Sequence, residues 1–404
     1  MKNKQTHYEK ILEAKKLISP YLSKTPLIYS KPFSDETNNQ IYIKPENLQK
    51  TGAFKIRGAF NKLLNLPAED LKKGVITASA GNHAQGVALA SKELGATATI
   101  VMPKATPVIK VNATKAYGAN VVLHGNDYDE AYEHSKKLEK ELNLTYVHPF
   151  DDYDIIYGQG TIAIEIYEEL KDADFLLVPI GGGGLISGMA IAAKHLNPAI
   201  QVLGVEPEGA MSMKTSLKNK QNTSLPHVQT IADGVAVKRV GNKTFSMVNQ
   251  LVDGIITVSD YDIMDSFLFF LEKHKMVCES AGALSLAALK KMSVVNKKVV
   301  CLVSGGNIDM VTVSSMITKG LLSRNRIFCF SVDLPDTPGE LLKIASLLEQ
   351  NQANVIKLDH NQFQNLDRFI HVQLQVTVET SGIEQINTLK QSLKDAGYSI
   401  KQIY

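Results

Sequence analysis

Residues 51–59 read TGAFKIRGA and set one lysine, Lys55, among small and apolar neighbours. A lysine amine attacks a carbonyl group only where desolvation or a nearby cation lowers its pKa, because the protonated amine has no free electron pair. Phe54 and Ile56 are placed to desolvate Lys55, and Arg57 to bring a positive charge near it. The stretch predicts a nucleophilic Lys55, although a solvated lysine on an amphipathic helix is the commoner case for such a residue taken alone.

Outward from this stretch, short apolar segments alternate with segments of helical periodicity, which is typical of parallel α/β sheets. Upstream we expect a helix, a loop through 25–26 and 31–32, and a strand at 41–44; downstream we expect strands at 75–78, 97–102, 120–123, 145–148, 175–180, 202–206, 254–258 and 299–303, with helices between them such as 160–170. This order predicts two open parallel-sheet α/β domains within residues 1–320, the smaller at about 51–153 and inserted in the larger. Ligands of open α/β folds bind at the carboxyl ends of strands, so a cleft between the sheets is the expected site.

The periodicity changes after residues 324–326. A half-buried strand, a helix, two strands, a helix and a last strand are expected at 327–334, 338–349, 354–358, 369–378, 383–396 and 399–404. This β-α-β-β-α-β order is that of ferredoxin-like domains. The sequence therefore predicts a separate small domain over residues 326–404.

Composition excludes several classes of protein. The 404 residues carry a net charge of +3 and 44% hydrophobic residues, without a basic block interleaved with aromatics, so nucleic acid is not an expected partner. The three cysteines lack C-x-x-C spacing, which argues against a disulfide framework and a zinc site. No segment has the apolar length of a signal peptide or a membrane helix. We therefore expect a cytoplasmic protein that does not enter a membrane.

A run of four glycines, Gly181, Gly182, Gly183 and Gly184, separates an apolar strand from a helix that begins near Leu185. Residues without a Cβ let backbone N–H groups converge on a ligand, and the helix N-terminus adds partial positive charge. No lysine follows at Walker spacing, which argues against a nucleoside triphosphate. The run predicts a phosphate-binding loop, and the alternative is a flexible turn.

Residues 79–86 read SAGNHAQG and also join a strand to a helix. Ser79 is a candidate N-cap, Gly81 allows close approach of a ligand, and Asn82 can donate and accept hydrogen bonds beside a reacting centre. An ordinary capped turn is the alternative. His83 has no companion ligands at metal spacing, so we interpret its side chain as structural.

Two later stretches add polar groups. Ser304 follows the last strand of the larger sheet and begins the turn that ends at Asn307, where its neutral hydroxyl suits a ring nitrogen; ordinary turn chemistry is the alternative. Glu279 is a weaker candidate, either a carboxylate near the pocket or a residue at a helix N-terminus.

Taken in this order, these motifs resemble the type II fold of pyridoxal-phosphate enzymes, of which tryptophan synthase β is another example, and within it the threonine dehydratases. The resemblance covers about residues 5–320 and is specific through the combination of motifs. It implies that Lys55 holds pyridoxal 5'-phosphate as a Schiff base, that Asn82 contacts the ring oxygen, that the glycine run and Leu185 bind the phosphate, and that Ser304 faces the ring nitrogen. The implied cofactor-binding residues are Phe54, Lys55, Asn82, Gly181, Gly182, Gly183, Gly184, Leu185 and Ser304, and the implied substrate-binding residues are Ser79, Ala80, Gly81, Asn82 and His83.

The resemblance implies a carbon–nitrogen lyase that converts L-threonine to 2-oxobutanoate and ammonia, and L-serine to pyruvate. Serine racemases resemble the same span, but they carry a serine where this chain has Ala80, and a methyl group cannot move a proton. Some relatives bind a divalent metal; of the matching positions Glu206, Ala210 and Ser212, only one is a carboxylate, so we expect no divalent metal and at most a monovalent cation. A second hypothesis is an amino-acid-sensing regulator with an inactive catalytic half.

Residues 336–341, DTPGEL, resemble the first turn of ACT-type amino-acid-sensing domains. This resemblance implies allosteric control, with isoleucine or valine as candidate effectors, and the alternative is a structural module. Unpaired edges of a small sheet favour pairing with a second copy, so a homodimer or homotetramer is expected. Whether the role is isoleucine biosynthesis or threonine breakdown stays open at this point, as does the preference between threonine and serine.

Overall fold

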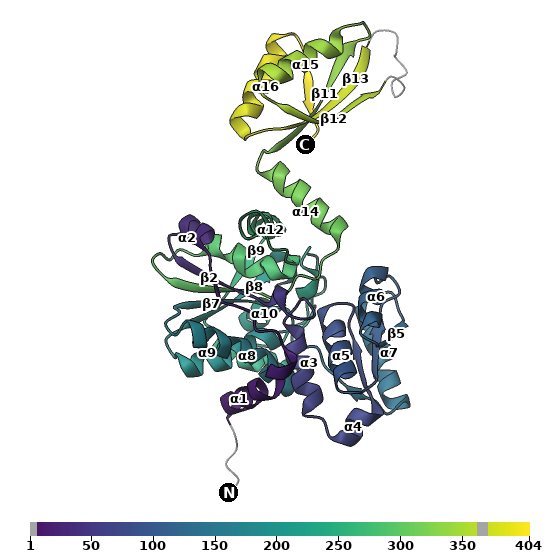
Figure 1. Ribbon diagram of the computed structural model, residues 1–404, viewed down its shortest axis with the longest axis vertical. Helices are drawn as coiled ribbons and strands as arrows, with labels where there is room; N and C mark the ends of the chain where they lie inside the picture. Colours follow the sequence, from purple (N-terminus) through teal and green to yellow (C-terminus); the bar gives the residue numbers. More distant parts are fainter. Residues whose placement is uncertain (1–5, 362–370) are drawn as a thin grey trace. The chain divides into compact units, whose positions relative to one another are not determined.

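The computed structural model describes residues 6–361 and 371–404, and these form two compact units, Met1–Asp309 and Met310–Tyr404 (Figure 1). The second unit begins with helix α14 (Met310–Ser323), most of which we had assigned to the catalytic region that was expected to end near residue 320. The first two residues of the strand expected at 369–378 lie outside the described residues.

The larger sheet of the first unit has six strands in the order β1-β2-β10-β7-β8-β9. Its strands are β1 (Ile28–Tyr29), β2 (Gln40–Pro45), β7 (Phe175–Pro179), β8 (Gln201–Pro207), β9 (Gly254–Val258) and β10 (Lys298–Val303). All neighbours are parallel except β1, which runs antiparallel to β2. The order brings β2, from the start of the chain, beside β10 from the end of the unit.

The smaller sheet lies in the chain between β2 and β7 and is wholly parallel, in the order β5-β4-β3-β6. Its strands are β3 (Val75–Ala78), β4 (Ala98–Met102), β5 (Asn120–Leu123) and β6 (Thr145–Tyr146). The expected pair of parallel α/β sheets is confirmed.

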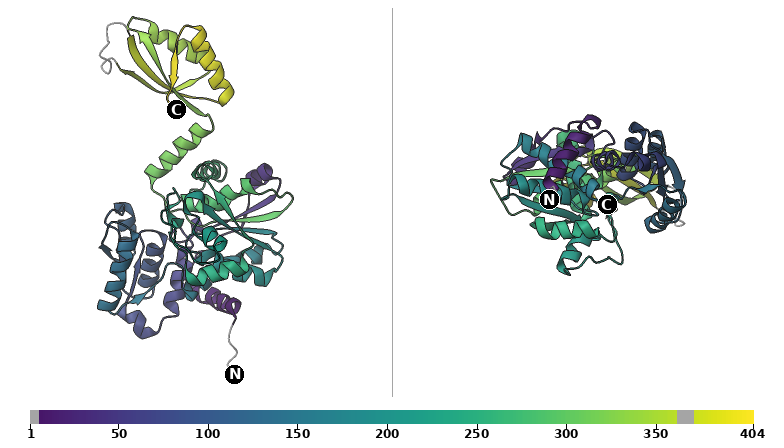
Figure 2. Two further views of the ribbon diagram at one scale, coloured as in Figure 1. Left: turned by 180° about the vertical axis from the view of Figure 1, so that it is seen from behind. Right: turned by 90° about the horizontal axis from the view of Figure 1, so that it is seen from below.

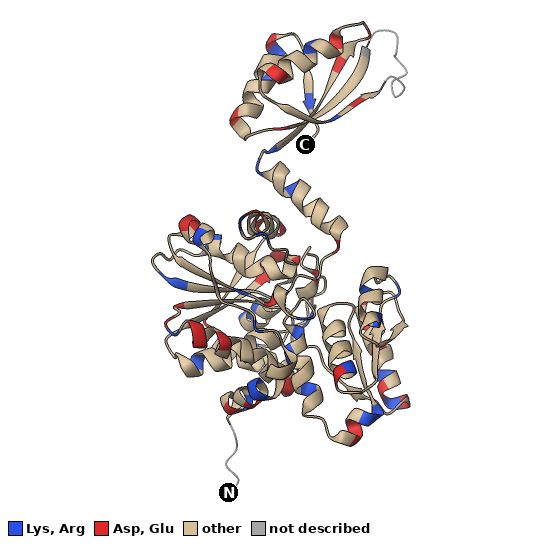
Figure 3. Cartoon of the chain, viewed as in Figure 1, with Lys and Arg blue, Asp and Glu red and all other residues tan. Residues whose placement is uncertain are grey.

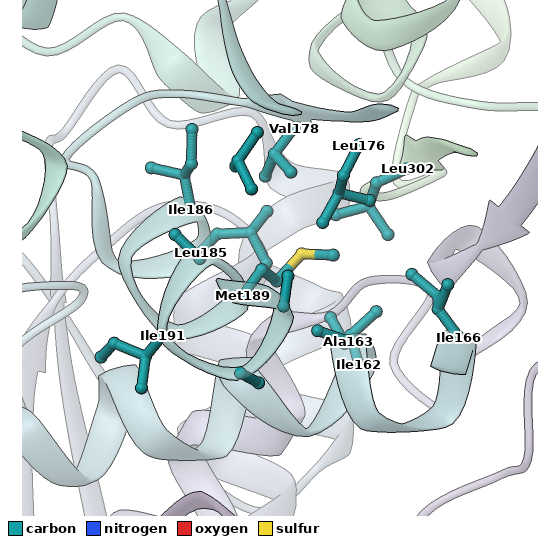
Figure 4. Packing of buried hydrophobic residues seen from close by; sticks show 14 of the residues in the cluster. Ile162, Ala163, Ile166, Leu176, Val178, Leu185, Ile186, Met189, Ile191 and Leu302 are labelled. Carbon is teal, nitrogen blue, oxygen red and sulfur yellow. The ribbon is translucent and has the colours of Figure 1, made fainter. Parts of the chain in front are cut away.

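Helices cover both sheets of the first unit (Figures 1 and 2). They are α1 (His7–Ile18), α2 (Lys31–Thr37), α3 (Lys55–Leu64), α4 (Ala68–Lys73), α5 (Asn82–Glu93), α6 (Val108–Ala116), α7 (Tyr128–Glu141), α8 (Tyr153–Glu169), α9 (Gly184–Leu196), α10 (Ser212–Lys218), α11 (Asn242–Leu251), α12 (Asp260–His274) and α13 (Leu284–Ala288). Short 3-10 turns include η2 (Glu46–Leu48), η3 (Glu208–Ala210), η4 (Asp233–Val235) and η5 (Ser280–Ala283). Apolar side chains of α8 and α9, such as Ile166 and Met189, pack against Leu176 of β7 and Leu302 of β10 and form the main core (Figure 4).

Two expectations about this unit were wrong. The segment expected as a loop at residues 31–32 begins helix α2, because Ser30 caps it by accepting the N–H of Phe33 at 3.3 Å and Pro32 suits a first turn. Helix α8 starts at Tyr153 rather than near residue 160, because Asp152 caps it. Gly158, within the first two turns of α8, lets α3 approach closely, because an added Cβ would lie 2.6 Å from Arg57 O.

The second unit has an antiparallel sheet in the order β12-β13-β11-β14. Its elements after α14 are β11 (Ile327–Pro335), α15 (Glu340–Gln350), β12 (Asn354–Asn361), β13 (His371–Glu379), α16 (Ile383–Asp395) and β14 (Ile400–Gln402). Ile344 of α15 and Leu389 of α16 pack with Phe330 and Leu374 of the sheet. The predicted ferredoxin-like order is confirmed.

Acidic and basic residues are interspersed along the elements of each unit (Figure 3), in agreement with the absence of a basic block in the sequence. Within residues 6–361 and 371–404, no helix combines the length and the apolar character that a membrane crossing requires.

Candidate active site

The Lys55 stretch is held by the turn that follows β10. Phe54 N donates to Ser304 O at 3.1 Å, Gly306 N donates to Gly52 O at 2.8 Å, and Ala53 forms an isolated bridge with Gly305. Gly52 has a φ of +70°, a conformation that favours glycine, and it turns the chain into this bridge. Residues 52–54 and 304–306 are far apart in the sequence but lie against each other. Ser304 is therefore close to Phe54, the residue before Lys55.

The amine of Lys55, the predicted nucleophile, has one hydrogen bond to a backbone carbonyl and a lowered pKa. Its Nζ donates to Pro149 O at 2.7 Å and lies 5.3 Å from the centroid of the Phe54 ring. Burial lowers the pKa of Lys55 to about 8, although the charge of Glu279 acts in the opposite direction. The predicted desolvation is therefore present, and the neutral fraction of the amine near neutral pH is larger than that of an ordinary lysine.

Arg57 does not act on Lys55 as expected. Its guanidinium is fully buried and paired with the carboxylates of Glu46 at 2.7 Å and Glu165 at 2.6 Å. Successive helical residues are turned by about 100°, so a residue two positions on points to a different side of α3. The charge of Arg57 is therefore compensated by Glu46 and Glu165 within the core. Desolvation, and not Arg57, accounts for the lowered pKa of Lys55.

The glycine run forms the turn between β7 and α9, and its shape depends on the missing side chains. Gly183 caps α9 with a φ of +93°. An added Cβ on Gly182 would lie 2.2 Å from the Phe150 ring, and one on Gly184 would lie 2.8 Å from Phe150 O. Phe150 is the residue after Pro149, whose carbonyl accepts the hydrogen bond from Lys55. The glycine run therefore packs on the residue next to the one that Lys55 contacts.

The loop also presents a helix N-terminus with free donors. The first N–H groups of a helix have no acceptor within it, which makes the start of α9 suited to a phosphate. The Leu185 side chain is 6% exposed and belongs to the core, so only its N–H remains for an anion. Thr244 Oγ donates to Gly182 O at 2.6 Å and fixes the peptide orientation.

If the loop holds the phosphate of pyridoxal phosphate, as the resemblance implies, replacing Gly182 by alanine should weaken binding of that cofactor by about 10-fold or more. The new methyl group would displace Phe150 and deform the turn, and overpacking of this kind costs about 1–3 kcal/mol. Spectrophotometric titration of the apoprotein with pyridoxal phosphate measures the affinity. The matched control is Gly254→Ala at the start of β9, where the nearest atom to an added Cβ is 3.4 Å away. Equal affinities in the two variants would contradict the role of the loop.

Residues 79–83, SAGNH, run from the end of β3 into the first turn of α5, which begins at Asn82. The N-cap of α5 is Gly81 rather than the expected Ser79, whose Oγ instead accepts the N–H of Gly81 at 3.3 Å. A Cβ on Gly81 would meet nothing within 4 Å, and Ala80 is half-buried, so this end of the loop has room for a substrate. Backbone N–H groups at the start of α5 are the expected partners of a carboxylate.

His83 is turned into the structure. Its Nε2 lies 3.0 Å from Val147 O, and burial lowers its pKa to about 3, so the ring is neutral. This burial agrees with the interpretation of the side chain as structural, and the place of His83 among the substrate-binding residues stays a prediction.

Asn82 is joined to two residues from the other side of the site. Its Nδ2 donates to Glu279 Oε1 at 2.8 Å, and its Oδ1 accepts from Asn307 Nδ2 at 2.8 Å. Glu279 was only a weak candidate and Asn307 was named only as the end of a turn, because their partner lies 197 and 225 residues away. The Ser304 hydroxyl is 3% exposed and lies 3.5 Å from Ala281 O.

The candidate cation position is organised as a helix cap. Both carboxylate oxygens of Glu206 accept N–H groups at the start of α10, from Met213 at 2.8 Å and Lys214 at 2.9 Å. Burial raises the pKa of Glu206 to about 7. Within the part of the chain that the structure describes, no group of three or more His, Cys, Asp or Glu residues is placed to hold a metal ion.

These features fit a cofactor that has a carbonyl, an aromatic ring and a phosphate. The lowered pKa of Lys55 suits the carbonyl. The glycine turn, which has no space for added side chains, suits the phosphate. Ser304 supplies a neutral, buried hydroxyl for a ring nitrogen.

Comparison with known proteins gives the same indication. The family model described as pyridoxal-phosphate dependent enzyme matches residues 18–305. The chain is 42% identical to the L-threonine ammonia-lyase of Thermotoga maritima over 394 residues, which are 97% of this chain and 98% of that protein. It is similar to the solved structure of processed threonine deaminase isoform 2 from Solanum lycopersicum, with a TM-score of 0.75, 40% identity, and coverage of 78% of this chain and 88% of that one. Maize serine racemase is also similar, with a TM-score of 0.74, 38% identity, and coverage of 78% and 98%.

Proposed function

Because this chain belongs to the pyridoxal-phosphate dependent enzymes, and within them to the L-threonine ammonia-lyases, we propose that it converts L-threonine, and also L-serine, to the corresponding 2-oxoacid and ammonia. The observation that carries the proposal is the half-buried Lys55 with its lowered pKa. It lies within the family match over residues 18–305, and the similarity to a threonine ammonia-lyase extends over nearly the full length of the chain.

When bound, pyridoxal phosphate supplies a carbonyl that reacts with amines and a conjugated ring that accepts the electrons released when the substrate loses its Cα proton. Lys55 is the residue that would hold it, and its free amine would be the base for that proton. The N-termini of α9 and α5 would hold the phosphate and the substrate carboxylate. Ser304 has no charge to offer a ring nitrogen, which favours elimination over chemistry that needs a protonated ring.

The decisive experiment is the visible absorption spectrum of the purified protein before and after addition of L-threonine, with 2-oxobutanoate and ammonia assayed in the same tube. We expect a band that disappears in Lys55→Ala and equal yields of oxoacid and ammonia. No band after addition of pyridoxal phosphate would contradict the enzyme and favour the alternative of an amino-acid sensor with an inactive catalytic half.

Racemisation of serine is the second candidate, favoured by the similarity to maize serine racemase. It needs an acid–base group on the face opposite the lysine, and the loop offers the methyl of Ala80 next to Gly81. D-serine as the main product from L-serine would favour this reaction over deamination.

Uptake of the cofactor by the apoprotein should accelerate as the pH rises through about 8, the value to which burial lowers the pKa of Lys55. Below that pH the amine is protonated and cannot attack, and above it the amine is neutral, whereas an ordinary lysine would require a pH of about 10.4. The initial rate of band growth after mixing apoprotein with pyridoxal phosphate measures this. A midpoint near the ordinary value would contradict the desolvated amine.

For the second unit we propose an ACT-type regulatory domain over residues 326–404, on the support of its ferredoxin-like sheet and the 336–341 motif. Isoleucine or valine is the proposed effector, which would need different affinities for two states of the enzyme. Saturating isoleucine should change the dependence of rate on threonine concentration; an unchanged rate curve and an unchanged distribution of oligomers would exclude this feedback.

We also propose a homodimer or homotetramer in the cytoplasm, where the buried unpaired Cys278, Cys301 and Cys329 would stay reduced.

A further inference from the structure

The amides of Asn82 and Asn307 form a hydrogen-bonded chain that ends on two acceptors. Asn307 Nδ2 donates to Thr51 O at 2.7 Å and to Asn82 Oδ1 at 2.8 Å, and Asn82 Nδ2 donates to Glu279 Oε1 at 2.8 Å. A backbone carbonyl has no proton to give, and the Glu279 carboxylate has none while it is ionised, above its pKa of about 7. The acceptors Thr51 O and Glu279 Oε1 therefore fix the orientation of both amides. If either amide were rotated by 180°, its oxygen would face one of these acceptor oxygens.

Counting the amide hydrogens of Asn82 and Asn307 shows which of them this hydrogen-bond network leaves unused. An amide nitrogen carries two hydrogens. Asn307 Nδ2 uses both within the chain, whereas Asn82 Nδ2 uses one, and the other has no partner among residues 6–361 and 371–404. Asn82 begins α5 beside Gly81, where the site has room for a ligand.

We propose that Glu279 is a positioning residue that, together with Asn307, holds the Asn82 amide so that its remaining N–H is presented as a donor to the ring oxygen of the cofactor. The inference rests on the proposed function. A donor stabilises the ionised form of that oxygen, whereas a reversed amide would present an acceptor and favour the protonated form. The state of the ring oxygen would therefore depend on a carboxylate that need not touch the cofactor.

The surroundings of Glu279 are built for a buried carboxylate. Its backbone N–H donates to Gly305 O at 3.0 Å, and an added Cβ on Gly305 would lie 2.6 Å from Glu279 Oε1, so the glycine makes room for it. Burial raises the pKa of Glu279 to about 7, although the hydrogen bond from Asn82 lowers it. The titratable groups near it are Lys55 of α3, Lys110 of α6, Asp233 of η4 and the adjacent Cys278.

The test is the pH dependence of the visible absorption band of the holoenzyme without substrate. The wild-type band should change as the pH crosses about 7, where Glu279 gains a proton and stops acting as a pure acceptor. Glu279→Gln keeps an acceptor oxygen without a titrating group, so its band should persist and lose this pH dependence. Glu279→Ala removes the acceptor, should shift the band at every pH, and should weaken cofactor binding about 10-fold. Glu208→Gln, an exposed glutamate of η3, is the matched control and should behave as wild type.

A Glu279→Gln holoenzyme with the wild-type pH profile would overturn the inference. If that variant does not fold, Asn307→Asp decides, because its carboxylate cannot donate to Thr51 O or Asn82; an unshifted band in Asn307→Asp would also overturn it. Failure of the proposed function is a separate result, since the wild-type protein would then form no band with pyridoxal phosphate at all.

Discussion

Replacement of Lys55 by alanine is expected to lower kcat for L-threonine deamination by on the order of 10⁴-fold or more and to abolish the visible band of the holoenzyme. The variant loses the group that bonds to the cofactor and also the base that takes the Cα proton, and general-base catalysis alone contributes about 10²–10⁴-fold. Fold stability should not suffer in proportion, because the removed amine is a buried group whose charged form is disfavoured, as its lowered pKa records. Steady-state assays and absorption spectra of the same preparations measure both effects.

Lys62→Ala is the matched control for this experiment. Lys62 lies on the same helix, but its amine pairs with Asp152 at 2.8 Å and Asp154 at 3.2 Å. The variant should retain the band and a kcat within about 2-fold of wild type, since the Lys62 amine contacts carboxylates at the start of α8 and not the Pro149 carbonyl that Lys55 contacts. Substantial activity in Lys55→Ala, or equal losses in the two variants, would remove Lys55 from its assigned role.

The strands were predictable because short runs of apolar and β-branched residues are typical of parallel strands, and this holds for β5 and β9 although their side chains are mostly only partly buried. Val75–Ala78, Asn120–Leu123 and Gly254–Val258 lie at the residues expected from the sequence. The glycine run was also visible, since missing side chains between a strand and a helix already indicate a close approach of ligand to backbone. The lowered pKa of Lys55 was expected for the right reason, desolvation, because its apolar neighbours are adjacent in the sequence, and its role as the nucleophile stays a prediction.

The contacts that the sequence did not reveal all join segments distant in the chain. Arg57 was placed beside Lys55 from adjacency, whereas its partners Glu46 and Glu165 are 11 and 108 residues away. Glu279 could not be assigned to Asn82 for the same reason. A short helix such as α2 has too few residues to show a period, and only its cap and proline indicate it. Local pattern thus predicts elements, whereas the partners of buried charges depend on tertiary structure.

Replacement of Arg57 by methionine is expected to destabilise the first unit by about 3–5 kcal/mol at neutral pH, because it leaves buried carboxylates without their partner. Glu46 and Arg57 are fully buried and the Glu165 side chain is 14% exposed, so water can compensate little. Lys44, whose amine lies 2.7 Å from Glu165, can neutralise only one of the two carboxylates. Denaturant unfolding of the holoenzyme and the apoprotein measures the cost.

The pH dependence of this cost follows from Glu165. Burial alone would raise the pKa of Glu165, but Arg57 and Lys44 hold it below its ordinary value. A depressed pKa stabilises the fold above the ordinary value of about 4.3 and ceases to do so as the pH falls through the folded-state value. The difference in the free energy of unfolding between wild type and Arg57→Met should therefore be largest at neutral pH. It should shrink on acidification, because the carboxylates of Glu46 and Glu165 that have lost their partner become protonated. The exposed pair Lys10–Glu13 provides the comparison, since Lys10→Met should cost about 1 kcal/mol or less. A similarly small cost for Arg57→Met, or one independent of pH, would show that the buried charges are compensated in another way.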